Sequence, residues 1–283
     1  MKSMPHLEQL WFENIRAPDW DEYNESSKEL LSETLGRLKV VICGDAAGSL
    51  TASQAFALVQ LASISQGANI QHLELASYHE DPSGVTLLGQ CHEWGGVVSL
   101  ISQSSFPPEA PNSLDNLRDL RLRQMVMDGA ASEPLLRNAI DKNKLRSIDI
   151  NFRRPRMADH EGPASCERIA EFSWLRGAES IRCIGLSNFR FRRYPTTDED
   201  LPLPSFLASF PNLETLEIGS EYYDDAELGS VIVAIMKATK LKRIYQRTVK
   251  GANLDCLRAA AKQLGVELIW GERPREWPVP IDD

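Results

Sequence analysis

Two short segments of the chain concentrate arginine and aromatic side chains. They read NFRRPR at residues 151–156 and SNFRFRRYP at residues 187–195. Arginine forms paired hydrogen bonds to carboxylates and phosphates and stacks on aromatic rings. The segments therefore predict a basic-aromatic binding surface for an acidic or phosphorylated partner, although charge runs are often plain solvated surface. The candidate residues are Arg153, Arg154, Arg156, Phe189, Arg190, Phe191, Arg192, Arg193 and Tyr194, with Phe152 interleaved.

Catalytic motifs are missing from the sequence. It has no Walker loop, no HExxH and no GxSxG. The segment 89–96 places His92 beside Cys91, but Glu93 stands where a nucleophile elbow needs glycine. The histidines do not cluster, and no two cysteines form a CxxC pair. We therefore expect no enzyme, no cofactor and no metal site.

Composition and cysteine usage narrow the class of protein. The 283 residues are 42% hydrophobic and 25% charged, as in a folded protein, and the net charge of -9 argues against binding to nucleic acid or to an anionic membrane. Five widely spaced cysteines indicate reduced thiols. No apolar run has the length of a signal peptide or a membrane helix. These features predict a cytoplasmic or nuclear protein.

One short pattern recurs along the whole chain: an apolar residue, two variable residues, an apolar residue, one variable residue and a last residue that is usually apolar. Successive copies begin about 25 to 47 residues apart. The longest step contains residues 85–111, where we expect an irregular repeat or an insertion. Each copy predicts a short strand, because its last two positions face one side. The copies are Leu7, Leu10, Phe12; Leu38, Val41, Cys43; Ile70, Leu73, Leu75; Leu117, Leu120, Leu122; Leu145, Ile148, Ile150; Ile181, Ile184, Leu186; Leu213, Leu216, Ile218; Leu241, Ile244, Gln246; and Val266, Ile269, Gly271.

Helices are predicted between these strands. Thr51 has the character of a helix cap, and Ser132 with Pro134 has the character of a helix start. Asp224 precedes apolar residues at helical spacing. Gly265 follows another such series and predicts a helix end. Alternating strands and helices fit either a doubly wound sheet or a solenoid.

The mutual likeness of the strand patterns favours the solenoid, as does the lack of a glycine-rich phosphate loop after the first strand. On these patterns, above all PHLEQLWFEN at 5–14 and PNLETLEIGS at 211–220, the chain resembles the leucine-rich-repeat family. The resemblance covers nearly the whole length. It implies an α/β fold: one solenoid domain over residues 1–283, with a curved parallel sheet on its concave side and helices on its convex side. The asparagine or cysteine that normally follows the strand is missing or shifted.

The irregular repeat lengths resemble those of fungal and plant F-box proteins. In that family such repeats form the substrate-receptor part of ubiquitin ligases. No F-box helix bundle is visible, and the first repeat begins at Met4 and Pro5. We therefore expect the C-terminal part of a longer protein, with an F-box adaptor as partner only if an N-terminal module is missing.

The concave face is predicted to be formed by the strand positions that flank the buried ones. Arginine and aromatic residues dominate binding hot spots, which makes their positions there candidates. Trp11, Tyr245 and Trp270 are expected to be exposed, although Trp270 could instead cap the core. The binding candidates on this face are Trp11, Arg121, Arg123, Asp149, Glu217, Arg243, Tyr245 and Arg247.

The two ends of a solenoid need covers over their apolar edges. Trp277, Pro278 and Pro280 are expected to fold over the last strand. Before Pro5 the sequence offers little that could serve as a cover, so Leu7 and Leu10 are expected to leave an exposed edge.

These observations predict a noncatalytic scaffold for protein recognition, with the substrate receptor of an F-box-type ubiquitin ligase as its narrower form. Two alternatives stay open. One is a doubly wound α/β enzyme, which would need a convergent polar pocket at the carboxyl ends of neighbouring strands. The other is a regulatory scaffold that binds an anionic ligand at the arginine segments.

Overall fold

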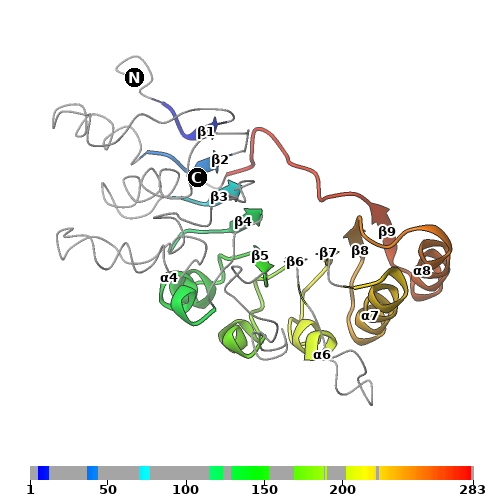
Figure 1. The fold of residues 1–283 in the computed structure, drawn as a ribbon. Coiled ribbons are helices and arrows are strands. Elements are labelled where there is room, and N and C mark those ends of the chain that lie inside the picture. Colours follow the sequence, from blue (N-terminus) through cyan, green and yellow to red (C-terminus); the bar gives the residue numbers. More distant parts are fainter. Residues whose placement is uncertain are drawn as a thin grey trace, which may run out of the picture. The chain divides into compact units, whose positions relative to one another are not determined.

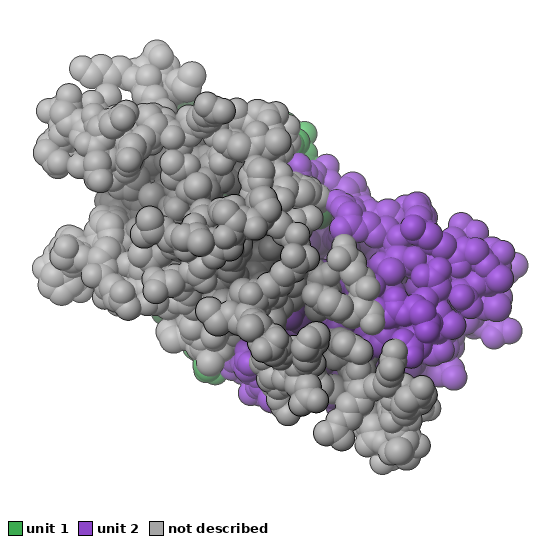
Figure 2. Space-filling model, viewed as in Figure 1, with its two compact units in different colours: residues 1–145, 276–283 green, residues 146–275 purple. Residues whose placement is uncertain are grey.

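The computed structural model describes residues 6–12, 37–43, 70–76, 115–123, 129–152, 169–187, 189, 202–220 and 223–281. The chain divides into two compact units, which Figure 2 distinguishes by colour. Unit 1 contains residues 1–145 and 276–283, and unit 2 contains residues 146–275. The expected irregular repeat at 85–111 and the expected cap at Thr51 lie outside the described residues.

The described part of unit 1 contains four parallel strands in chain order. They are β1 (Gln9–Phe12), β2 (Val40–Cys43), β3 (His72–Ala76) and β4 (Asp119–Arg123). Helix α4 (Gly129–Asp141) follows β4. The helix starts before Ser132, which is buried inside it, so the expected start at Ser132 and Pro134 is wrong.

Among its described residues, unit 2 has five parallel strands, also in chain order: β5 (Ser147–Asn151), β6 (Cys183–Ser187), β7 (Thr215–Gly219), β8 (Arg243–Gln246) and β9 (Glu267–Trp270). Between them lie the 3-10 helix η3 (Ser173–Leu175) and the helices α6 (Pro202–Ala208), α7 (Asp225–Ala238) and α8 (Gly251–Leu264). Figure 1 shows α6, α7 and α8 on one side of the strands. The α/β class with parallel strands is therefore confirmed.

The register of the strands matches the recurring sequence pattern. In unit 2, the middle positions of successive copies pair in one row, Ile148 with Ile184, Leu216 and Ile244. All four are buried completely. In unit 1 the corresponding row is Leu10, Val41, Leu73 and Leu120. The apolar spacing thus predicted which face of each strand is buried.

Strand β9 differs from the pattern by one residue. Leu268, not Ile269, pairs with Ile244, and Ile269 pairs with Tyr245 on the opposite face. A shift of one residue turns every side chain of a strand to the other face. The reason lies in the preceding helix end, because the Val266 N–H donates to Ala261 O at 2.9 Å and so belongs to the helix cap.

Local signals at the helix ends of unit 2 acted as predicted. Asp224 caps α7, accepting hydrogen bonds from Ala226 N and Glu227 N at 2.9 and 2.8 Å. Gly265 ends α8 in the left-handed conformation, with φ of 70°. Among the helices in the described part of the chain, none is both long and apolar enough to cross a membrane.

Candidate functional site

Each unit has one face of strand side chains that points away from the buried row, and we call it the open face. Alternation along a strand places every second residue there. In unit 2 its two rows are Ser147, Cys183, Thr215 and Arg243, and Asp149, Gly185, Glu217 and Tyr245. In unit 1 they are Gln9, Val40, His72 and Asp119, and Trp11, Ile42, Glu74 and Arg121. Most of these side chains are polar or charged.

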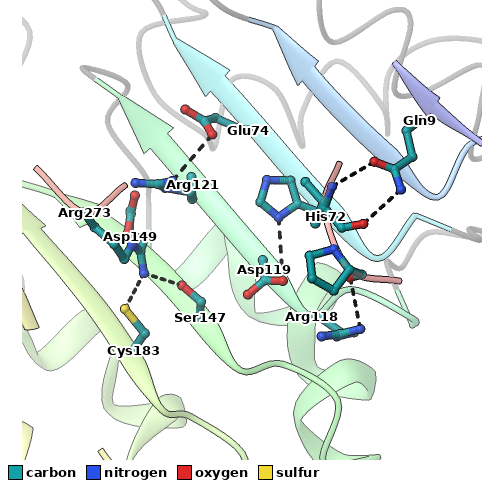
Figure 3. A network of polar contacts seen from close by, with 12 residues as sticks. Gln9, His72, Glu74, Arg118, Asp119, Arg121, Ser147, Asp149, Cys183 and Arg273 are labelled. Carbon is teal, nitrogen blue, oxygen red and sulfur yellow. Dashed lines mark hydrogen bonds and ion pairs between the residues drawn. The ribbon is translucent and has the colours of Figure 1, made fainter. Parts of the chain in front are cut away.

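Arg273, which follows β9, lies across the open face of unit 2 (Figure 3). Its Nη2 donates to Asp149 Oδ1 at 3.0 Å, and its Nη1 donates to Ser147 Oγ at 2.8 Å and to Cys183 Sγ. Its Nε lies 3.8 Å from Glu217 Oε2. One guanidinium therefore contacts three neighbouring strands, β5, β6 and β7.

The charges around Arg273 hold it as a cation. Burial alone would lower the pKa of Arg273, but the negative charge of Asp149, with that of Glu217, outweighs burial and raises the pKa above its usual value. Burial has the larger effect on Cys183 and raises the pKa of its thiol, against the opposing charge of Arg273. Cys183 is therefore a neutral thiol at physiological pH, not an activated nucleophile.

Gly185 leaves the room that Asp149 occupies. A Cβ placed on Gly185 would lie 2.7 Å from Asp149 Cγ, closer than real carbon contacts. The missing side chain in β6 therefore lets Asp149 of β5 lie over the sheet toward Arg273.

In unit 1, ionisable side chains of β3 and β4 lie in two pairs (Figure 3). Glu74 is completely buried, and its Oε2 lies 3.8 Å from Arg121 Nη1. His72 is 8% exposed and its Nδ1 lies 3.6 Å from Asp119 Oδ2. Both nitrogens of His72 are buried without a hydrogen bond.

The C-terminal segment covers the open face at β1 and β2. Val279 packs with Val40 and Ile42, and Trp11 and Ile281 lie against this cluster. The Trp277 ring meets Trp11 edge-on, with centroids 5.3 Å apart. The expectation that Trp277, Pro278 and Pro280 cover the last strand is therefore wrong, because the apolar residues that receive this segment are on β1 and β2.

The residues predicted for the concave face differ in their burial and in their ion pairs. Trp11 is half-buried, and Asp149 and Glu217 face Arg273. Arg243 and Arg247 are exposed, and Arg247 pairs with Glu272. Arg121 and Tyr245 are buried, at 5% and 7% exposure, so the expected exposure of Tyr245 is wrong. Trp270 is 49% exposed, whereas the side chain of Arg123 lies outside the described residues.

The two arginine segments begin side by side. Asn151 pairs with Ser187, and the Phe152 N–H donates to Ser187 O at 3.0 Å. Phe152 and Phe189 are buried, at 3% and 0% exposure, so Phe189 does not belong to an exposed binding surface as expected. The other candidates lie outside the described residues: Arg153, Arg154, Arg156, Arg190, Phe191, Arg192, Arg193 and Tyr194.

Sequence reasoning missed Arg273, Gly185 and the apolar pair Val40 and Ile42. A signal existed for the pair, because β2 reads VVIC and is apolar on both faces, which is typical of a strand covered on both sides. No pattern marks Arg273, since its contacts with Asp149 and Ser147 join positions more than 120 residues away, at separations of 124 and 126.

Within the residues that the structure describes, no group of three or more His, Cys, Asp or Glu side chains is placed to hold a metal ion. The open faces instead carry ion pairs and, at β1 and β2, an apolar patch. No protein-family model matches the chain, and comparison with curated proteins finds no match.

Proposed function

We propose that the chain is a leucine-rich-repeat solenoid that acts as a noncatalytic scaffold and binds a protein partner on its open faces. The observation that carries the proposal is the series of parallel strands in chain order, each presenting alternate side chains to one face. Repeat proteins use such extended faces for recognition. We propose that it acts in the cytoplasm or the nucleus, as its widely spaced cysteines suggest.

The open face of unit 2 supports recognition better than catalysis. Its acidic groups are engaged with Arg273, which is bound to Asp149 and close to Glu217. Its thiol, Cys183, has a raised pKa because it is buried. At the edge toward β8 and β9, Arg243 and Trp270 are exposed, and arginine and tryptophan are frequent anchors of protein interfaces.

The narrower proposal is the substrate-receptor part of an F-box-type ubiquitin ligase. It rests on the resemblance of the irregular repeats and on fold-level analogy, which does not by itself imply function.

The experiment that tests the proposal is capture of partners from the cells that make this protein. Arg243→Glu places the opposite charge on the open face, and Arg258→Glu makes the same change on an exposed residue of α8. We expect one defined set of proteins to be captured by the wild type and by Arg258→Glu, and at least five-fold less by Arg243→Glu. Equal capture by all three would argue against the open face of unit 2 as the binding surface.

A further inference from the structure

The segment that covers β1 and β2 is held by its backbone as well as by its side chains. The side-chain amide of Gln9 donates through Nε2 to Val279 O at 2.9 Å. The same amide accepts through Oε1 from Val279 N at 2.9 Å. Figure 3 shows the pair of bonds. An extended residue can present its N–H and C=O toward one side, as strand residues do when they exchange both bonds with a neighbour. Gln9 therefore recognises the backbone of a single residue, Val279.

The two prolines beside Val279 determine which residue meets Gln9. Proline has no backbone N–H, so Val279 is the only donor among residues 278–280. The Pro280 carbonyl accepts a longer hydrogen bond, at 3.5 Å, from Arg118 Nη1. A proline-flanked residue thus fits the amide of Gln9 in a single register.

Side-chain contacts on both sides of the backbone contact add selectivity. Val279 is 8% exposed and packs with Val40 and Ile42, where a charged side chain would be desolvated without a partner. Trp277 remains 45% exposed although its ring contacts Trp11. The face accordingly takes an aliphatic residue in its centre and an aromatic residue at its margin.

The contact between Val279 and Gln9 is small, and its occupancy is raised because both residues belong to the same chain. Two hydrogen bonds add little net free energy, because they replace hydrogen bonds that the same groups make with water. Attachment to the same chain gives the segment an effective concentration on the order of millimolar. A free segment with the same chemistry and more contacts can therefore compete with residues 277–281 for the face.

We propose that the surface formed by Gln9, Trp11, Val40 and Ile42 is a docking site for a proline-flanked aliphatic segment of a protein partner. Residues 277–281 occupy the site as a built-in competitor. The proposal rests on the proposed recognition function and names the chemistry of the partner. Partners lacking such a segment leave the C-terminal segment in place.

The test uses the full chain and a fluorescent, end-capped peptide with the sequence EWPVPI of residues 276–281. The double variant Trp277→Ser with Val279→Ser vacates the site. We expect it to bind the peptide at least ten-fold more tightly than the wild type, measured by fluorescence anisotropy. Adding Gln9→Ala should remove this gain, as should a peptide in which the central valine is aspartate. The control variant Leu264→Ser loses an exposed apolar side chain at the end of α8 and should bind like the wild type.

A second measurement covers the case in which the double variant does not fold. In the wild-type chain, millimolar peptide should speed hydrogen exchange at the Val279 amide at least five-fold, and the aspartate peptide should not. Unchanged exchange in the wild type, or a folded double variant that fails to bind the peptide, overturns the inference. Partner capture that depends on Arg243 would then still support the broader function, which separates the two failures.

Discussion

At the scale of the residue, the open face of unit 2 depends on a cation from outside its strands. Arg273 and Asp149 have side chains that are only 13% and 14% exposed, and both are charged. Two charges so far from water are tolerated because each compensates the other, with further hydrogen bonds to Ser147 and Cys183. The pair is therefore a sensitive point for the stability of unit 2.

Replacing Arg273 with alanine should lower the free energy of unfolding by about 3 kcal/mol, since the buried Asp149 would lose its ion pair with Arg273. The matched change Arg247→Ala removes a pair whose arginine is 64% exposed. It should cost less than about 1 kcal/mol, because surface ion pairs contribute little. Urea unfolding of both variants checks this, and equal losses would contradict the central role of Arg273.

Gly185 gives a second prediction at this scale. Gly185→Ala should destabilise the protein by about 1–3 kcal/mol, because the new Cβ would displace Asp149 from Arg273. Gly229→Ala in α7 is the control, since the new Cβ would lie 4.0 Å from Val249, an ordinary van der Waals contact. That change should stabilise the helix by about 0.5–1 kcal/mol. Thermal unfolding of the two variants should thus shift in opposite directions, and a shared direction would refute the steric argument.

At the scale of the element, the sequence predicted the strands better than it predicted which segments pack on them. The apolar spacing located the buried row because Ile148, Ile184, Leu216 and Ile244 obey one local rule. It placed the buried positions of β9 one residue too late, because Val266 belongs to the cap of α8 and its N–H donates to Ala261 O. It also misplaced residues 277–281, since their contacts with Gln9 and Val40 are far away in sequence and follow no local period. Such long-range contacts decide which open-face residues are exposed.

Helix α7 permits a test of a local signal that did act as predicted. Asp224→Ala should lower the free energy of unfolding by about 1 kcal/mol, because two N–H groups at the start of the helix lose their acceptor. Asp224→Asn should restore most of the loss, since an amide oxygen can accept the same bonds. Chemical denaturation measures both. Loss of stability in the asparagine variant equal to that in alanine would indicate that charge, not capping, is what matters.

At the scale of the whole molecule, charge is distributed unevenly along the chain. The net charge is -9, yet residues 151–156 and 187–195 contain six arginines between them. The paired ends of β5 and β6 place the starts of these two segments next to each other. Like charges brought together repel, and an acidic partner would relieve the repulsion. The prediction of an anionic partner thus rests on the sequence and on the neighbouring ends of two strands.

The triple change Arg154→Ala, Arg190→Ala and Arg193→Ala tests that prediction against a control of equal charge. The control replaces Lys240, Arg258 and Lys262, which are exposed in unit 2, with alanine. We expect the arginine variant to bind a captured partner more weakly and with a smaller dependence on salt, because fewer charge-assisted hydrogen bonds form. Its stability should change by less than about 0.5 kcal/mol per substitution. If it unfolds, the arginines are structural; if it binds as the control does, recognition takes place on the open faces without them.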